Sequence, residues 1–221
     1  MPRPLLDMPL AQTPVAVLDF ETTGSAAGFD RVVEATVVRV EPDGRQHIVF
    51  DSLIHPQREM GCTWVHGITD ADVADAPTFE QVAPALRAAL SGCCVTAWNA
   101  SFDISFLRFE MERAGWDCSP PHACLMWMRP LLGLGKRCGL AAACASHGLV
   151  NRLAHSAAGD AMAAAGLVEI YRRAAAARGV STWADLTRLK SYRFMSSWSA
   201  APIPPIRRRP VCRLKPRWIG R

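Results

Sequence analysis

The chain has 221 residues, half of them hydrophobic and a fifth of them charged, which favours one globular domain with a real core plus an appendage. No apolar run approaches the ~20 residues of a transmembrane helix. Prolines and an acid interrupt the N-terminal segment, so it lacks the apolar core of a signal peptide. We therefore expect a cytoplasmic protein with no membrane contact. The eight cysteines include no C-x-x-C pair, which argues against a tetrahedral zinc site and favours reduced thiols.

The net charge of +5 conceals two oppositely charged parts. Residues 1–177 contain 14 Lys and Arg against 19 Asp and Glu, a net charge of −5, whereas residues 178–221 contain 11 Lys and Arg against one acid, a net charge of +10. An acidic body fits a metal-binding carboxylate site, and a basic segment fits contact with a polyanion or a partner. We expect a leader at 1–13, a folded domain at 14–177 and a basic Pro/Arg-rich C-terminal extension at 178–221.

The first predicted strand ends in two carboxylates, Asp19 and Glu21. Alternate residues of a strand face the same side, so these side chains converge. A buried pair of like charges takes up a proton or binds a cation, and oxygen-only ligands suit Mg²⁺ or Mn²⁺. Thr22, Thr23 and Gly24 then predict a turn able to bring backbone N–H groups near an anionic substrate.

Two further β-rich runs, 32–40 and 48–54, flank the turn sequence Glu41-Pro-Asp-Gly44 and complete a three-stranded meander. Residues 63–70 are expected to form a loop in which Thr69 caps the next element of the chain. Strands followed by strand–helix alternation predict a mixed α/β layer fold. The later elements are an apolar strand at 93–98 and helices at 79–90, 99–115, 124–132, 140–147 and 156–178.

Three later residues extend the acid pair. Asp103 lies in the first turn of a helix that Asn99 or Ser101 can cap, and Asp160 lies in the first turn of the last helix, five residues after His155. Four carboxylates and an imidazole supply what two-metal phosphodiester hydrolysis requires, with the two cations about 3.5–4 Å apart. An imidazole is suited to take the proton from the attacking water.

The motifs that carry these residues resemble those of the DEDDh 3′→5′ exonucleases, the group that contains the proofreading epsilon subunit of bacterial DNA polymerase III. The resemblance covers roughly residues 14–175 and implies a ribonuclease-H-like fold, a mixed five-stranded sheet with helices on both faces. The chain departs from the family's common pattern at Trp98 and Cys124, which could signal an outlying subgroup. The matching segments, in chain order, are Asp19-Phe-Glu-Thr-Thr-Gly24, Val65-His-Gly-Ile-Thr69, Asn99-Ala-Ser-Phe-Asp103 and His155-(four residues)-Asp160.

The resemblance implies roles for the matched residues. His155 would be the general base, and two Mg²⁺ or Mn²⁺ ions would be bound by Asp19, Glu21, Asp103 and Asp160. Support or stacking is expected from Asn99 and Phe102, although Phe102 is more typical of a core residue. For His66, substrate contact and a role in bracing the turn are equally favoured. The terminal nucleotide would contact the turn formed by Thr22 and Thr23.

The main functional hypothesis is a metal-dependent 3′→5′ exonuclease that acts on single-stranded or frayed DNA ends, in proofreading or repair, with a DNA polymerase as a possible partner. One alternative is an exoribonuclease that trims RNA ends, a choice that depends on recognition of the 2′-OH. A non-catalytic binding subunit is the other alternative, but it predicts a lost carboxylate or histidine, and none is missing. The basic extension, with Trp198 and Trp218, could hold the substrate strand, dock an acidic partner or remain solvated, and we favour the first.

Overall fold

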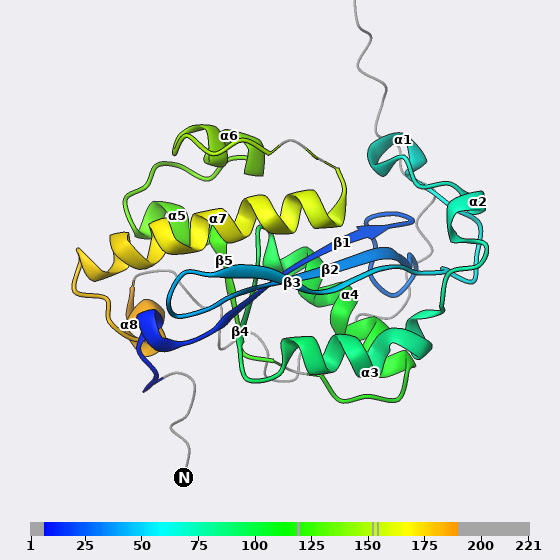
Figure 1. Cartoon of the computed structure of the whole chain (residues 1–221), viewed down its shortest axis with the longest axis horizontal. Helices are drawn as coiled ribbons and strands as arrows, with labels where there is room; N and C mark the ends of the chain where they lie inside the picture. Colours follow the sequence, from blue (N-terminus) through cyan, green and yellow to red (C-terminus); the bar gives the residue numbers. More distant parts are fainter. Residues whose placement is uncertain (1–6, 119, 152, 154, 190–221) are drawn as a thin grey trace, which may run out of the picture.

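The computed structural model describes residues 7–118, 120–151, 153 and 155–189 (Figure 1). Its centre is a five-stranded sheet in the order β3-β2-β1-β4-β5. The first three strands form an antiparallel meander, and β4 and β5 continue the sheet parallel to β1. The predicted mixed five-stranded sheet with flanking helices is thereby confirmed. The strands are β1 (Val15–Thr22), β2 (Val32–Val40), β3 (Gln46–Leu53), β4 (Cys94–Ala97) and β5 (His122–Cys124).

Helices cover both faces of the sheet (Figure 1). The longest, α7, crosses one face together with α5 and α6, and α3 and α4 pack against the other. None of the helices in the described part of the chain combines the length and apolarity needed to cross a bilayer. The helices are α1 (Thr63–His66), α2 (Asp70–Val73), α3 (Phe79–Leu90), α4 (Ala100–Arg113), α5 (Leu125–Leu131), α6 (Leu140–Ala145), α7 (Ala157–Ala176) and α8 (Trp183–Arg188), with a short 3₁₀ helix at Leu10–Gln12.

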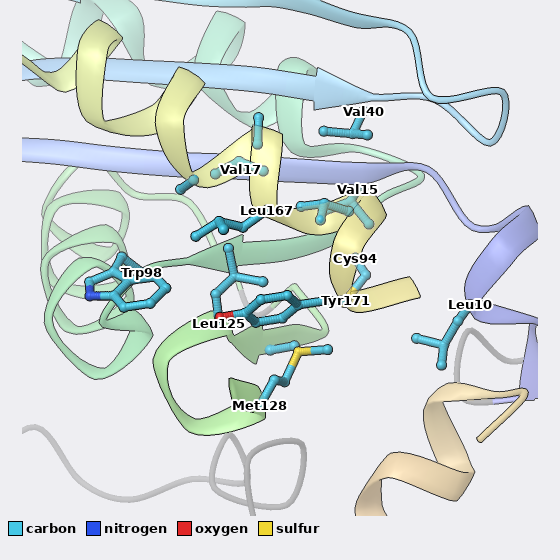
Figure 2. Packing of buried hydrophobic residues seen from close by; sticks show 14 of the residues in the cluster. Leu10, Val15, Val17, Val40, Cys94, Trp98, Leu125, Met128, Leu167 and Tyr171 are labelled. Atoms are coloured by element: carbon cyan, nitrogen blue, oxygen red, sulfur yellow. The ribbon is translucent and has the colours of Figure 1, made fainter. Parts of the chain in front are cut away.

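The alternation of side chains along β1 divides the core in two. Val15 and Val17 pack on the α7 face, whereas Ala16, Leu18 and Phe20 pack against α3 and α4. All five are at most 4% exposed, so β1 is buried on both faces. Figure 2 shows the apolar cluster on the α7 face around Leu125, Leu167 and Tyr171. Since odd-numbered β1 residues face α7, the same period of two aims Asp19 and Glu21 at that helix.

The structured body extends beyond both boundaries expected from the sequence. Leu10 is buried, and its N–H donates to the Ser181 carbonyl at 2.9 Å. In α8, Trp183 and Leu186 belong to the same apolar cluster as Leu10. The leader and the start of the basic extension thus pack against each other, because their few apolar residues belong to one apolar cluster with Val15 of β1. The rest of that extension, with Trp198 and Trp218, lies outside the described residues, and its expected role stays a prediction.

Two shorter segments also differ from the expectations. Residues 63–70 contain α1 and the start of α2 where a loop was predicted; α1 is a single turn between Cys62 and Gly67, both with left-handed backbone, so it leaves no periodic pattern. The predicted cap at Thr69 is present, because Thr69 and Asp72 form a capping box. The strand β5 precedes α5 and was missed because it is only three residues long.

Candidate metal centre and active site

Three of the predicted carboxylates meet where the C-terminal end of β1 faces the N-terminal end of α7. Asp19, Glu21 and Asp160 each present a carboxylate oxygen, and these oxygens lie within 4.8 Å of one another. The first turn of α7 is fixed by its N-cap residue, because Ser156 Oγ accepts the Gly159 N–H at 3.1 Å. This capped turn holds Asp160 opposite the two strand residues.

Asp103 reaches the same end of β1 from the opposite layer. It lies in the first turn of α4, is 4% exposed, and its Oδ1 accepts the Phe20 N–H at 3.2 Å. Phe20 stands between Asp19 and Glu21, so this bond ties Asp103 to the strand segment that carries both. Because β1 and β4 are parallel and α4 follows β4, the topology brings Asp103 to the end of β1 that carries Asp19 and Glu21.

The electrostatics of this cluster are those of carboxylates forced together. Burial raises the pKa of Asp19 well above its ordinary value, and the charges of Asp103, Asp160, Glu21 and Glu34 raise it further. Burial raises the pKa of Glu21 to about 7, with added repulsion from Asp160 and Glu34. At neutral pH the metal-free site therefore retains protons on part of its carboxylates, the condition in which a bound cation replaces a proton.

The pKa of Asp103 is also raised, to about 7, chiefly by burial. Two backbone hydrogen bonds, one of them from the Phe20 N–H, lower it and partly offset the burial. The side-chain atoms that could bind a metal are thus all carboxylate oxygens, and without a cation their mutual repulsion is not compensated. Such a set fits a hard divalent cation such as Mg²⁺ or Mn²⁺.

His155 lies immediately before the N-cap Ser156 of α7, the helix that carries Asp160. Its side chain is exposed, and within the described residues it forms no hydrogen bond or ion pair. Its backbone has a φ of +67°, a left-handed conformation that few non-glycine residues adopt. The imidazole is therefore free to meet a substrate or water, and its assignment as the general base stays a prediction.

The turn after β1 is built differently from the expectation. The Thr23 N–H donates to the Arg31 carbonyl at 2.8 Å, and the Thr22 hydroxyl donates to the Gly24 carbonyl at 2.6 Å. The Thr23 hydroxyl donates to Asp30 Oδ1 at 3.3 Å. These groups are committed to folding the turn, so the Thr23 amide is not available to an anionic substrate. Contact of Thr22 and Thr23 with a nucleotide stays a prediction, through their remaining surface.

Buried polar contacts hold this turn in place. A Cβ atom at Gly24 would overlap the carboxylate of Asp30, so only glycine leaves room for that side chain. Arg31 Nε lies 2.7 Å from Glu110 Oε1 on α4, and both side chains are at most 6% exposed. The same Glu110 oxygen accepts the Val32 N–H at 3.2 Å. Since Arg31 and Glu110 connect the turn to α4, they fix it relative to the helix that carries Asp103.

The remaining predicted substrate residues lie around this end of the sheet. His66 accepts the Ile68 N–H at its Nδ1, 3.0 Å away. Burial lowers the pKa of His66, and the backbone carbonyls of Gly61 and Thr22 oppose that shift, which places the ring beside the turn after β1. Asn99 occupies the N-cap position of α4 but makes no capping bond with its side chain, which instead accepts the Ser101 hydroxyl at 3.0 Å.

Phe102 packs against the edge of the apolar cluster on the α3 and α4 face. It is half-buried, and its ring centroid lies 4.9 Å from that of Phe106. Trp98, which precedes the Asn99–Asp103 segment, is 9% exposed and packs in the cluster on the α7 face. Cys124 is fully buried, and its thiol donates to the Trp98 carbonyl at 3.3 Å. The two departures from the family pattern thus contact each other within the core.

Two polar residues at the site were not foreseen. The Asn151 side-chain amide donates to Asp160 Oδ1, and its own side-chain oxygen accepts the Leu153 N–H at 3.1 Å. Glu34, on β2 opposite Glu21, accepts the Ala157 N–H at 2.8 Å. No motif marks Glu34, but it is the one acid of β2, whose buried residues are mostly valines, and this feature could have drawn notice.

Comparison with known proteins identifies the family. The sequence model of the family described as Exonuclease (RNase_T) matches residues 16–168. A DNA polymerase III subunit epsilon-like protein of Rhodobacter capsulatus is 32% identical over 202 residues, which cover 85% of this chain and 28% of that protein. A PolC-type DNA polymerase III of Bacillus cereus is 33% identical over 108 residues, which cover 48% of this chain and 8% of that protein. The chain therefore spans less than a third of the length of either relative.

A solved structure shares the fold. Exonuclease I of E. coli, in complex with a dT13 oligonucleotide, superposes with a TM-score of 0.66 over 76% of this chain and 43% of that chain, at 16% sequence identity. This likeness confirms the α/β ribonuclease-H-like architecture expected from the motifs. The family match covers more than half of the residues and includes all four matching segments in their predicted order. The chain belongs to the exonuclease family, nucleases that act on nucleic acids and typically use divalent metals.

Proposed function

We propose that this chain is a metal-dependent 3′→5′ exonuclease of the DEDDh type, which hydrolyses the 3′-terminal phosphodiester of single-stranded or frayed DNA and releases nucleoside monophosphates. The observation that carries the proposal is the convergence of Asp19, Glu21 and Asp160 within 4.8 Å, reached by side chains from two elements. Asp103, bonded to the backbone between the two strand acids, completes the set of four. A structural role alone does not explain four repelling carboxylates at one end of a sheet.

Two divalent cations, Mg²⁺ or Mn²⁺, would be held by Asp19, Glu21, Asp103 and Asp160. When bound, such a pair supplies charge stabilisation to the attacking and leaving oxygens of an in-line displacement. The protein's own contribution is to keep these carboxylates fixed and partly desolvated, so that little reorganisation is needed when the cations bind. The raised pKa values of Asp19, Glu21 and Asp103 are consistent with this role.

His155 would take the proton from the attacking water at an imidazole nitrogen and later release it to solvent. Its exposed position, one residue before the N-cap of the helix that carries Asp160, supports this role. Within the described residues no hydrogen bond engages its imidazole, which is consistent with a role toward water. General acid–base catalysis of this kind contributes about 10²–10⁴-fold to rate.

The substrate end would enter beside the turn after β1. Thr22 and Thr23 line that turn, and His66 packs next to it. Single-stranded DNA is the proposed substrate because the solved neighbour, exonuclease I, binds a dT13 oligonucleotide and the relatives are named as DNA polymerase III proteins. For the same reason we propose a DNA polymerase as a partner.

The test is digestion of matched 5′-labelled single-stranded DNA and RNA oligomers with Mg²⁺, with Mn²⁺ and with EDTA. The proposal predicts a ladder that shortens from the 3′ end, faster for DNA, and abolished by EDTA. A third oligomer, blocked at its 3′ end, controls for polarity, and the Asp103→Asn protein prepared in parallel controls for contaminating nuclease. Faster loss of RNA would replace the DNA substrate with RNA. No shortening with either metal would overturn the catalytic assignment and favour a binding subunit.

A further inference from the structure

We propose that Glu34 is a positioning residue, which holds the first turn of α7 against β2 and thereby keeps Asp160 within reach of Asp19 and Glu21. This inference rests on the proposed function, because it concerns the same carboxylate site. The observation behind it is a single long-range hydrogen bond, in which Glu34 Oε2 accepts the Ala157 N–H at 2.8 Å across 123 positions of sequence.

The strand geometry places Glu34 for this contact. In the β1–β2 pairing Glu34 lies directly opposite Glu21, and the register shifts immediately afterwards, between Glu21 and Thr22. Val38 and Val40 of β2 pack in the cluster on the α7 face, so the period of two directs Glu34 to that face as well. The side chain therefore projects from the sheet toward the end of α7 that carries Asp160.

The helix end needs such a partner. The first N–H groups of a helix have no acceptor within the helix, and the positive end of the helix dipole favours a negative side chain. Ser156 Oγ satisfies the Gly159 N–H, and Glu34 satisfies that of Ala157. A charge-assisted bond of this kind is stronger than a neutral one. Asp160 is three residues beyond Ala157 in the same helical turn, so a contact that fixes the position of Ala157 also fixes that of Asp160.

The opposite side of the same turn is also held. A Cβ atom at Gly159 would overlap the backbone carbonyl of Leu153, so the loop before α7 lies directly on the helix at that point. Asn151, from that loop, donates to Asp160. The first turn of α7 is thus clamped between β2 on one side and the preceding loop on the other, and Glu34 is the contact on the sheet side.

The charge of Glu34 has an electrostatic cost that argues for a positional role. Glu34 raises the pKa of Glu21 and of Asp19, so it adds repulsion to a site that already contains four carboxylates. A neutral acceptor would hold Ala157 with less repulsion. If Glu34 acts through its hydrogen bond, glutamine at this position should preserve Mn²⁺ binding, whereas alanine should not.

The experiment compares Glu34→Gln, Glu34→Ala and Ala157→Pro. The last variant removes the donated hydrogen and leaves the acid in place, at the first helical position, where proline is tolerated. Ser156 has the extended backbone that precedes proline readily, with φ −124° and ψ 141°. The matched control is Asp185→Ala, because Asp185 accepts the Ser181 and Thr182 N–H groups at the start of α8, away from the site.

Mn²⁺ binding is measured by electron paramagnetic resonance, and kcat and KM for a single-stranded DNA oligomer are measured separately. Glu34→Ala and Ala157→Pro should each weaken Mn²⁺ binding about 10–100-fold, the usual effect of removing a residue that orients a metal ligand. Both should lower kcat more than they change KM. Glu34→Gln should stay within about threefold of wild type in Mn²⁺ affinity, since it retains the acceptor. Asp185→Ala should bind Mn²⁺ as the wild type does.

Wild-type Mn²⁺ affinity in Glu34→Ala would overturn the proposal. So would a loss in Glu34→Gln as large as that in Glu34→Ala, because the charge rather than the bond would then be responsible. If Glu34→Ala does not fold, Ala157→Pro and Glu34→Gln decide the question by the same criteria. Since Mn²⁺ binding needs no turnover, failure of the proposed exonuclease activity would be seen separately, as wild-type protein that binds Mn²⁺ but leaves DNA intact.

Discussion

The two ends of the contact between β1 and α7 are built from the same two elements and have opposite chemistry. At one end Val15 and Val17 face Leu167 and Tyr171 in an apolar cluster (Figure 2). At the other end the next two residues on the same face of β1 are Asp19 and Glu21, which face Asp160. Beside them, Glu34 accepts a hydrogen bond from the Ala157 N–H of α7. The four residues of β1 that face α7 thus change from apolar at positions 15 and 17 to acidic at positions 19 and 21.

This contrast explains how the fold tolerates a cluster of repelling charges. Burial of the apolar end stabilises the fold by roughly 25 cal/mol per Å² removed from water. The charged end opposes folding, because its carboxylates raise one another's pKa. The helix is anchored to the sheet by the apolar cluster at one end, and at the charged end by the hydrogen bond that the Ala157 N–H donates to Glu34. Variants at the charged end should therefore change activity, and variants at the apolar end should change stability.

The largest effect is expected from removal of a central carboxylate. In Asp19→Ala, turnover should fall to the level of wild-type protein in EDTA, because the charges of all the other site acids act on the Asp19 carboxyl. Binding of the labelled DNA oligomer should remain measurable by gel shift. The exposed Asp75→Asn serves as the surface control. A variant at position 19 that keeps normal turnover would remove Asp19 from the proposed metal centre.

The next largest effect is expected at His155. His155→Ala should lower kcat about 10²–10⁴-fold, the usual contribution of general acid–base catalysis. Folding should change little, since the side chain is exposed and has no hydrogen bond within the described residues. A near-normal kcat in His155→Ala would assign the base to another group.

The apolar end is tested by Leu167→Ala. Leu167 is fully buried in the cluster on the α7 face, so its truncation should lower the free energy of unfolding by about 2–5 kcal/mol. Urea denaturation followed by circular dichroism measures this change. Well below the unfolding midpoint, kcat should stay near that of wild type. Ile48→Ala, at a residue that is 46% exposed, is the matched control and should cost far less. A large loss of kcat in folded Leu167→Ala would show that the two ends are not separable.

The sequence was sufficient to predict the elements that carry the site acids, but it did not reveal the contact made by Glu34. The strand that carries Asp19 and Glu21 was predictable because a short apolar run has a definite period, and the helix that carries Asp160 because it is long. Their meeting followed from the family resemblance rather than from periodicity. Glu34 was missed because its role depends on the register that sets it opposite Glu21 and on a bond across 123 positions.

Elements that depend on contacts between distant parts of the chain were also beyond sequence reasoning. Leu10 and Trp183 have no pattern of their own, and they are buried only because the two ends of the body meet. The hydrogen bond of the Thr23 N–H could not be foreseen, since its acceptor, the Arg31 carbonyl, lies across the loop that separates β1 from β2. In each case the missing information was tertiary geometry.

The smallest expected effect, and the one that tests the electrostatic cost directly, is the pH dependence of stability without metal. Glu21 and Asp103 have a pKa of about 7 in the folded protein, well above the values near 4 of unfolded chains. Between these values the folded state binds more protons than the unfolded state, so stability should fall as pH rises from about 4 to about 7. In EDTA, the site should therefore oppose folding more at pH 8 than at pH 5.

Other acids shift in the opposite direction, since the pKa values of Asp43, Asp72 and Asp185 are lowered by hydrogen bonds. The contribution of the site is therefore measured as the difference in the free energy of unfolding between wild type and Asp103→Asn, determined by urea denaturation in EDTA. The variant should be more stable than wild type at pH 8, by on the order of 2 kcal/mol, and the difference should be clearly smaller at pH 5. Added Mn²⁺ should stabilise the wild type at pH 8 and the variant much less. If the two proteins are equally stable in EDTA at both pH values, the carboxylates at this end do not strain the fold, and the contrast between the two ends of α7 has no energetic basis.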